Sequence, residues 1–82
     1  MALTSRTPIQ LGTELRRYRK SRKLTQAALG ELVNKRQATI STLEAEGSAT
    51  LDTLFAVLSA LDLELELRPR SKGNNAKLGD IF

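Results

Sequence analysis

Residues 25–47 have the sequence TQAALGELVNKRQATISTLEAEG, and their pattern predicts two short helices joined by a tight turn. Counted from Gln26, the small residue Gly30 stands fifth and the apolar Ile40 stands fifteenth. Asn34, in ninth place, tolerates the left-handed backbone that a tight turn requires. This spacing is that of a helix-turn-helix, a unit that commonly places its second helix in the major groove of DNA.

The two helices of this unit have recognisable ends. Thr25 is a good cap for the first helix. Because glycine commonly follows the last turn of a helix, Gly47 places the second helix over residues 36–45. Gly30 costs its helix about 1 kcal/mol relative to alanine. We interpret it as a sign that the two helices approach each other closely, since a side chain there would push them apart.

One further helix is predicted on each side of the unit. Thr7 caps a helix over residues 8–21, with Pro8 at its first position and Gln10 placed to complete a capping box. Thr50 caps the last helix. The apolar face of that helix consists of Leu51, Leu54, Phe55, Leu58 and Leu61.

After the last helix the periodicity changes to strict alternation. Residues 63–68 read LELELR, which predicts a strand with Leu63, Leu65 and Leu67 on its buried face. Such a strand has no partner within a helical chain, so we expect it to pair with the same strand of a second copy across a twofold axis. The alternative is an amphipathic extension of the helix.

The predicted fold is therefore mainly α, with four or five helices and one C-terminal β-strand that pairs across a homodimer. We expect a flexible N-terminus over residues 1–6, one domain over residues 7–68 and a mobile tail over residues 69–82. A chain of 82 residues buries only about 60% of the surface that it exposes when unfolded, and dimerisation would compensate for so small a core.

Histidine and cysteine are both absent from the chain, and its carboxylates are scattered. Their absence removes thiol nucleophiles, disulfides, cysteine–histidine zinc sites and the usual general base near neutral pH. We therefore expect no enzymatic activity, no cofactor and no metal. Since the sequence shows neither the apolar run of a signal peptide nor about 18 consecutive apolar residues, we expect a cytoplasmic protein, associated with the nucleoid through DNA.

The formal net charge of +4 is unevenly distributed along the chain. Residues 1–46 carry nine Lys/Arg and four Asp/Glu, whereas residues 47–82 carry four and five. The basic half contains the helix-turn-helix, as expected of a surface that contacts phosphate. Charge alone would fit an ordinary solvated helix face equally well, and only its coincidence with the motif favours DNA.

Taken together, these motifs resemble a known family. TQ at residues 25–26, QATIS at residues 37–41 and the alternating strand make residues 10–68 similar to Xre-type (phage-repressor-like) helix-turn-helix proteins. Within that family the chain is most similar to HipB-like antitoxins, the DNA-binding halves of HipA/HipB toxin–antitoxin pairs. The resemblance implies a structural ion pair between Arg19 and Glu44, which would join the first and third helices.

A third helix that lies in the major groove meets the bases with its first turn and its outward face. Gln37 has the hydrogen-bonding groups for adenine, and Arg36 has those for guanine. The predicted base-contacting residues are Arg36, Gln37, Ala38, Ser41 and Thr42. The predicted phosphate-contacting residues are Thr25, Gln26, Lys23, Lys35 and Arg22. The alternatives are a solvated helix face, and simple helix capping by the residues at the N-terminus of the second helix.

The C-terminal tail ends in apolar residues after a polar stretch. Leu78, Ile81 and Phe82 resemble a short linear anchor that folds into a pocket of a partner. The family resemblance implies that Phe82 contacts a HipA-like kinase toxin. The alternative is a frayed end without function.

These features predict a homodimeric repressor of the antitoxin type. It would bind an inverted-repeat operator in double-stranded DNA, repress its own operon and hold a HipA-like kinase toxin inactive. One alternative is a stand-alone regulator, such as a prophage repressor or a restriction-modification controller. Another is a protein-interaction adaptor that does not bind DNA.

Overall fold

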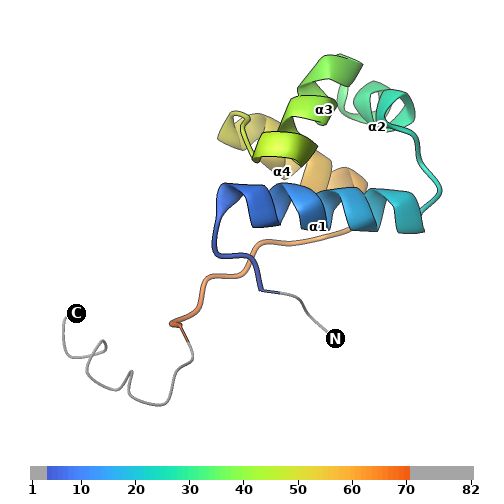
Figure 1. Ribbon diagram of the computed structural model, residues 1–82. Coiled ribbons are helices and arrows are strands. Elements are labelled where there is room, and N and C mark those ends of the chain that lie inside the picture. Colours follow the sequence, from blue (N-terminus) through green and yellow to red (C-terminus); the bar gives the residue numbers. More distant parts are fainter. Residues whose placement is uncertain (1–3, 71–82) are drawn as a thin grey trace.

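The computed structural model describes residues 4–70, and four helices form within this range (Figure 1). They are α1 (Pro8–Ser21), α2 (Gln26–Val33), α3 (Gln37–Glu46) and α4 (Leu51–Ala60). α3 packs against α1 and α2, and α2 also packs against α4. The mainly helical class and the four helices are confirmed, and the third helix is shifted by one residue from its predicted bounds. None of the helices within the described range combines the length and the apolar character that a membrane span requires.

Threonine side chains begin three of the helices, as the sequence predicts. Thr7, Thr25 and Thr50 accept hydrogen bonds through Oγ1 from the backbone N–H three residues later, at 3.1, 2.9 and 3.1 Å. Gln10 differs from the prediction, because its Oε1 accepts from the N–H of Arg6, at 2.6 Å, and not from the cap residue itself. A cap of this kind contributes about 1 kcal/mol, so these helix starts are determined locally.

All four helices contribute to one hydrophobic core. Its buried residues are Leu15, Leu29, Ile40, Leu43, Val57, Leu58 and Leu61. The predicted apolar face of α4 is wrong in part, because Leu51 and Phe55 are 70% and 50% exposed. Thr53 and Val57 are buried in their place. The face that a helix buries is set by the neighbour that it meets, which for α4 is α2.

Two glycines allow backbones to approach closely. A Cβ on Gly30 would lie 2.7 Å from the carbonyl oxygen of Lys35, so the turn folds back directly onto α2. The predicted close approach at Gly30 is found, but its nearest partner is the turn before α3 and not the body of α3. A Cβ on Gly12 would lie 2.5 Å from the carbonyl oxygen of Leu43 and 2.6 Å from that of Glu44. α1 and α3 therefore cross in backbone contact, a feature that no sequence pattern indicated.

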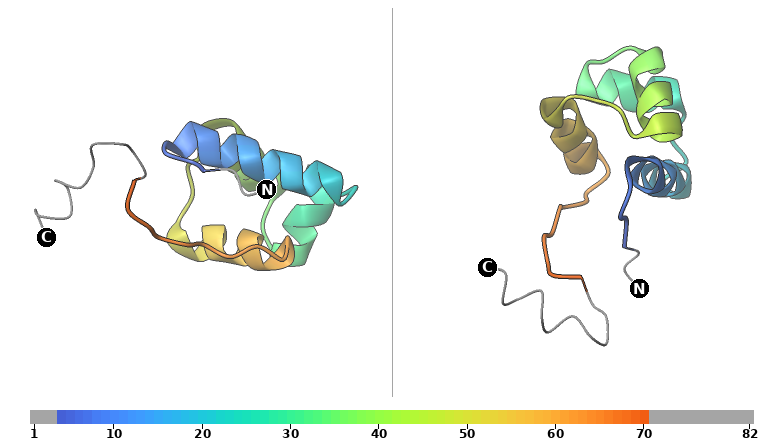
Figure 2. Two further views of the ribbon diagram at one scale, coloured as in Figure 1. Left: turned by 90° about the horizontal axis from the view of Figure 1, so that it is seen from below. Right: turned by 60° about the vertical axis from the view of Figure 1, so that its left-hand side comes forward.

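Residues 63–70 form neither a strand nor a helix, and no strand occurs anywhere in the described part of the chain. The segment doubles back beneath α1 and α4 (Figures 1 and 2), and Arg68 Nη2 donates to Thr4 Oγ1 at 3.2 Å. The helical extension of α4 is thus wrong, since α4 ends at Ala60. A strand needs a neighbour for its backbone hydrogen bonds, which a single chain does not offer here, so pairing with a second copy stays a prediction.

Candidate nucleic-acid interface

The turn between α2 and α3 determines where α3 lies. Asn34 follows α2 in the left-handed conformation, with φ of 59°, and its N–H donates to the carbonyl oxygen of Glu31 at 3.2 Å. Gly47 ends α3 in the same conformation, with φ of 70°. The roles predicted for Asn34 and Gly47 are therefore confirmed, and α3 is held at both ends by sharp changes of chain direction.

One face of α3 is buried and the opposite face lies in solvent. Ile40, Leu43 and Glu44 are buried. The five predicted base-contacting residues are all exposed: Arg36, Gln37, Ala38, Ser41 and Thr42. Ala45 is exposed too, and it continues the same face one turn beyond Ser41. Ala45 is not among the predicted base-contacting residues, although its i, i+4 spacing from Ser41 places it on the same face.

The start of α3 differs from the starts of the other three helices. Arg36 occupies the cap position with extended backbone, φ −73° and ψ 153°, and makes no side-chain hydrogen bond to the helix. The side chain of Arg36 is exposed, and it stands at the end of α3 where the helix dipole is positive. The combination of a cation and an uncapped helix start favours an anionic partner at this end of α3.

The ion pair that the family resemblance implies is formed between α1 and α3. Arg19 Nε donates to Glu44 Oε2 at 2.6 Å, and Arg19 Nη2 donates to Glu44 Oε1 at 3.1 Å. Arg19 Nη1 donates to the carbonyl oxygen of Leu24 at 2.6 Å. The two side chains are only 7% and 3% exposed. This buried, hydrogen-bonded pair connects α1 to the last turn of α3.

A chain of hydrogen bonds leads from this ion pair to the surface. Gln26 Nε2 donates to Glu44 Oε1 at 3.1 Å, and Gln37 Nε2 donates to Gln26 Oε1 at 3.4 Å. The N-terminal ends of α2 and α3 therefore lie side by side. The exposed residues that precede these two ends are Lys23, Thr25, Lys35 and Arg36. Polar and basic residues of two separate turns therefore lead into these two adjacent helix ends, which together form the junction of α2 and α3.

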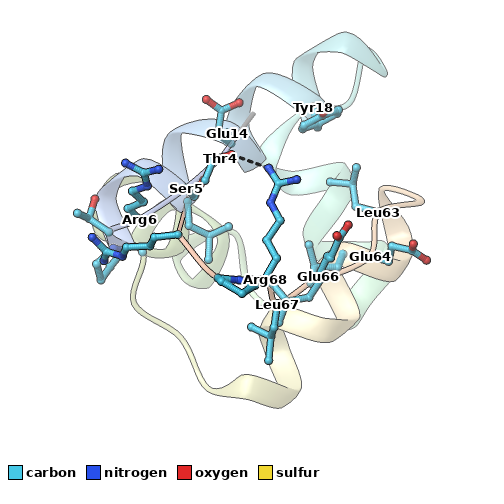
Figure 3. Close-up of a pocket in the computed structure, with 18 residues that line it drawn as sticks. Thr4, Ser5, Arg6, Glu14, Tyr18, Leu63, Glu64, Glu66, Leu67 and Arg68 are labelled. Atoms are coloured by element: carbon cyan, nitrogen blue, oxygen red, sulfur yellow. Dashed lines mark hydrogen bonds between the residues drawn. The ribbon is translucent and has the colours of Figure 1, made fainter. Parts of the chain in front are cut away.

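Arg22 is the predicted phosphate-contacting residue that departs from this arrangement. Its guanidinium carbon lies 5.8 Å from the centre of the Tyr18 ring, a cation–π contact. Tyr18 lines a groove beneath α1 (Figure 3). The Arg22 side chain is therefore held over an aromatic ring of α1.

The groove beneath α1 is a second surface, with a volume of about 770 Å³. It lies between the N-terminal segment, one side of α1 and residues 63–70 (Figure 3). The three leucines of the predicted dimer strand become steadily more exposed along this segment. Leu63 packs partly against the core, Leu65 is 47% exposed and Leu67 is 89% exposed. The predicted toxin-contacting residues Leu78, Ile81 and Phe82 lie outside the described residues.

Comparison with known proteins adds independent observations. The model of a family described as "Helix-turn-helix" matches residues 15–67. A solved structure of a HipB variant in complex with O2, a 20-mer, is 30% identical, with a TM-score of 0.79 over 87% of this chain and 100% of that one. A HipA–HipB–O2–O3 complex is also 30% identical, with a TM-score of 0.77 over 85% and 100%. A complex of HipB with an O4 20-mer has a TM-score of 0.78 at the same identity and coverage. None of the curated proteins compared matches this chain.

Proposed function

The chain belongs to the Xre-like helix-turn-helix family, and on that premise we propose that it is a sequence-specific DNA-binding repressor that acts as an antitoxin. It binds an inverted-repeat operator in double-stranded DNA and represses its own operon. It holds a HipA-like kinase toxin in an inactive complex. It acts in the cytoplasm by binding alone and has no enzymatic activity.

The junction of α2 and α3 is the observation that carries this proposal. The exposed face of α3 offers small and polar side chains, and the hydrogen bond between Gln37 and Gln26 joins the start of that face to the start of α2. A helix presented in this way fits the major groove, while residues at helix N-terminal ends meet phosphates.

The residues of the junction divide into two roles. The base-reading residues are Arg36, Gln37, Ala38, Ser41 and Thr42. The phosphate-contacting residues are Thr25, Gln26, Lys23 and Lys35, and Arg22, which lies over the Tyr18 ring, is the fifth candidate. The base contacts give specificity, and the phosphate contacts set the register and most of the salt-dependent affinity.

Dimerisation places two copies of α3 on one operator. Leu63, Leu65 and Leu67 form a strand that pairs with the same strand of a second copy and covers the exposed leucine side chains. Two recognition helices about 34 Å apart then read successive half-sites on one side of the DNA. Twofold symmetry of the dimer requires the operator to be an inverted repeat.

The toxin partner is proposed from the similar structures and from the composition of the tail. One of the structures similar to this chain is a complex that contains both HipA and HipB. In the present chain Leu78, Ile81 and Phe82 supply an apolar anchor for the toxin. A single aromatic anchor in a pocket is a common source of affinity for a segment of this type.

Fluorescence anisotropy with the DNA just upstream of this gene tests the repressor function. We expect the wild type to bind in the presence of scrambled competitor, and Gln37→Ala to lose at least roughly tenfold in affinity, because a bidentate base contact is lost. Gln10→Ala is the matched control, since Gln10 is exposed on α1. The proposal of a specific repressor would be refuted if the wild type, Gln37→Ala and Gln10→Ala all bound every DNA sequence equally weakly and salt abolished that binding.

Co-purification with the product of a neighbouring kinase-sized gene tests the antitoxin function. We expect the wild type to retain the kinase and Phe82→Ala to release most of it, while both proteins bind DNA equally. Sequence-specific DNA binding without any kinase partner would instead identify a stand-alone regulator.

A further inference from the structure

The groove beneath α1 contains a carboxylate oxygen that lacks a hydrogen-bond donor. Glu14 lines the groove, its Oε1 is buried, and no group in residues 4–70 donates a hydrogen bond to that atom. We propose that Glu14 Oε1 binds the guanidinium of Arg68 from a second copy, so that Glu14 helps to select the partner in the dimer. This inference rests on the proposed homodimer and adds a charged contact to its apolar ones.

The first step concerns the environment of Glu14. Its side chain is 23% exposed, but Oε1 itself is shielded from water. Arg17 Nη1 lies 3.6 Å from Oε1, which is too far for a hydrogen bond. A shielded oxygen without a donor is unfavourable, and a cationic donor offsets this most strongly. Glu14 is therefore prepared for a cation that residues 4–70 of one chain do not supply.

The second step identifies the cation. The proposed strand pairing lays residues 63–68 of the second copy beside the same residues of this chain, which form one wall of the groove. Arg68 is the one basic residue in LELELR. Its Nη2 donates to the neutral hydroxyl of Thr4 at 3.2 Å, and the guanidinium has further N–H donors that fit a carboxylate. Arg68 of the second copy therefore has the chemistry that Glu14 requires.

The third step concerns the register of the two strands. In an antiparallel pair, a twofold axis at Leu65 or at Glu66 would set Glu66 opposite an acidic residue of the second copy, which is unfavourable. An axis at Leu67 instead sets Glu66 opposite Arg68 of the second copy. Glu66 lines the groove across from Glu14 (Figure 3). The register that charge favours therefore carries Arg68 to this groove.

The fourth step separates the contributions of the two carboxylates. Glu66 is exposed, so water screens an ion pair with it and the pair contributes little. Glu14 Oε1 is shielded, and a charge-assisted hydrogen bond is stronger there. The twofold axis repeats the contact, so each substitution acts twice in a homodimer. Selection of the partner therefore depends more on Glu14 than on Glu66.

Charge exchange between two variants tests whether the contact joins separate copies. We expect Glu14→Arg and Arg68→Glu each to raise the dissociation constant of the homodimer by at least roughly tenfold, measured by sedimentation equilibrium. An equimolar mixture of the two should form far more heterodimer than the two homodimers predict, because both contacts then join opposite charges. Native mass spectrometry measures the heterodimer, and circular dichroism checks that each variant is folded.

Glu31→Arg is the matched control, because Glu31 is exposed on α2 and does not line the groove. Mixed with Arg68→Glu, it should give only the amount of heterodimer that the two homodimers predict. The same result for Glu14→Arg mixed with Arg68→Glu would overturn the inference, since mixing cannot restore a contact within one chain.

Leu67→Asp distinguishes failure of this inference from failure of the proposed dimer. If Leu67→Asp dissociates the dimer and the charge variants do not, the strand pairing stands and the contact between Glu14 and Arg68 is overturned. A wild type that is monomeric at every concentration would overturn the proposed dimer and this contact together.

Discussion

Arg19 is a charged residue in the interior, with 7% of its side chain exposed, and its guanidinium uses all three nitrogens. Burying a charge is unfavourable unless its hydrogen bonds and a counter-charge replace those of water. Glu44 provides the counter-charge and accepts two hydrogen bonds from Arg19, and the carbonyl oxygen of Leu24 accepts a third. Removal of Arg19 leaves the carboxylate of Glu44 buried without its counter-charge.

We expect Arg19→Ala to lower the free energy of unfolding by about 3–5 kcal/mol, measured by urea unfolding at a fixed protein concentration. Arg17→Ala is the matched control on the same helix. Its side chain is 62% exposed, and its ion pair with Glu14 spans 3.6 Å, so the loss should stay below about 1 kcal/mol. Similar losses of unfolding free energy in the two variants would show that the buried ion pair stabilises the fold no more than the exposed one does.

At the scale of the element, α3 begins with a weaker local signal than the other helices. Thr7, Thr25 and Thr50 cap their helices, whereas Arg36 provides no side-chain cap. The position of α3 therefore depends on the turn at Asn34 and on packing against α1 and α2. Arg36 therefore adds no capping hydrogen bond to α3, but its charge is well placed to contact an anion.

We expect Arg36→Ser to raise the free energy of unfolding by about 0.5–1 kcal/mol, because serine caps a helix well. The same substitution should weaken binding to the operator by roughly tenfold, because a base contact is lost. Arg16→Ala removes an equal charge from the exposed face of α1 and controls for charge alone. Unchanged DNA binding by Arg36→Ser would remove Arg36 from the base-reading residues.

At the scale of the whole molecule, several large apolar side chains are left in solvent. Those of α4 and the following segment are Leu51, Phe55, Leu65 and Leu67. Single exposed apolar residues are common, but Leu65 and Leu67 both line the groove beneath α1, and this is the surface that the proposed partner would cover. A second copy of this chain fits, since it would also enlarge a small core.

We expect Leu67→Asp to raise the dissociation constant of the homodimer by at least roughly a hundredfold, because one buried leucine contributes about 1.5–3 kcal/mol and the substitution occurs twice. Sedimentation equilibrium measures the effect. Glu66→Gln, on the other face of the predicted strand, is the control and should leave the dimer intact. A Leu67→Asp protein that dimerises like the wild type would exclude this strand from the interface.

The starts of α1, α2 and α4 and the turns that end α2 and α3 were determined by the sequence alone, because each depends on atoms within a few residues of one another. Thr25 binds the N–H of Ala28, and Asn34 turns the chain through its own backbone conformation. The exposed face of α3 was predictable for the same reason, since helical periodicity separates Ser41 from the buried Leu43.

Only the tertiary structure decided which partners distant residues meet. It turned Val57 rather than Leu51 into the core, because α2 lies on that side of α4. It made Gly12 the crossing point of α1 and α3. It also joined Gln26 to Glu44, 18 residues apart in the sequence. Local rules describe each helix by itself, whereas these contacts exist only once the helices have packed against one another.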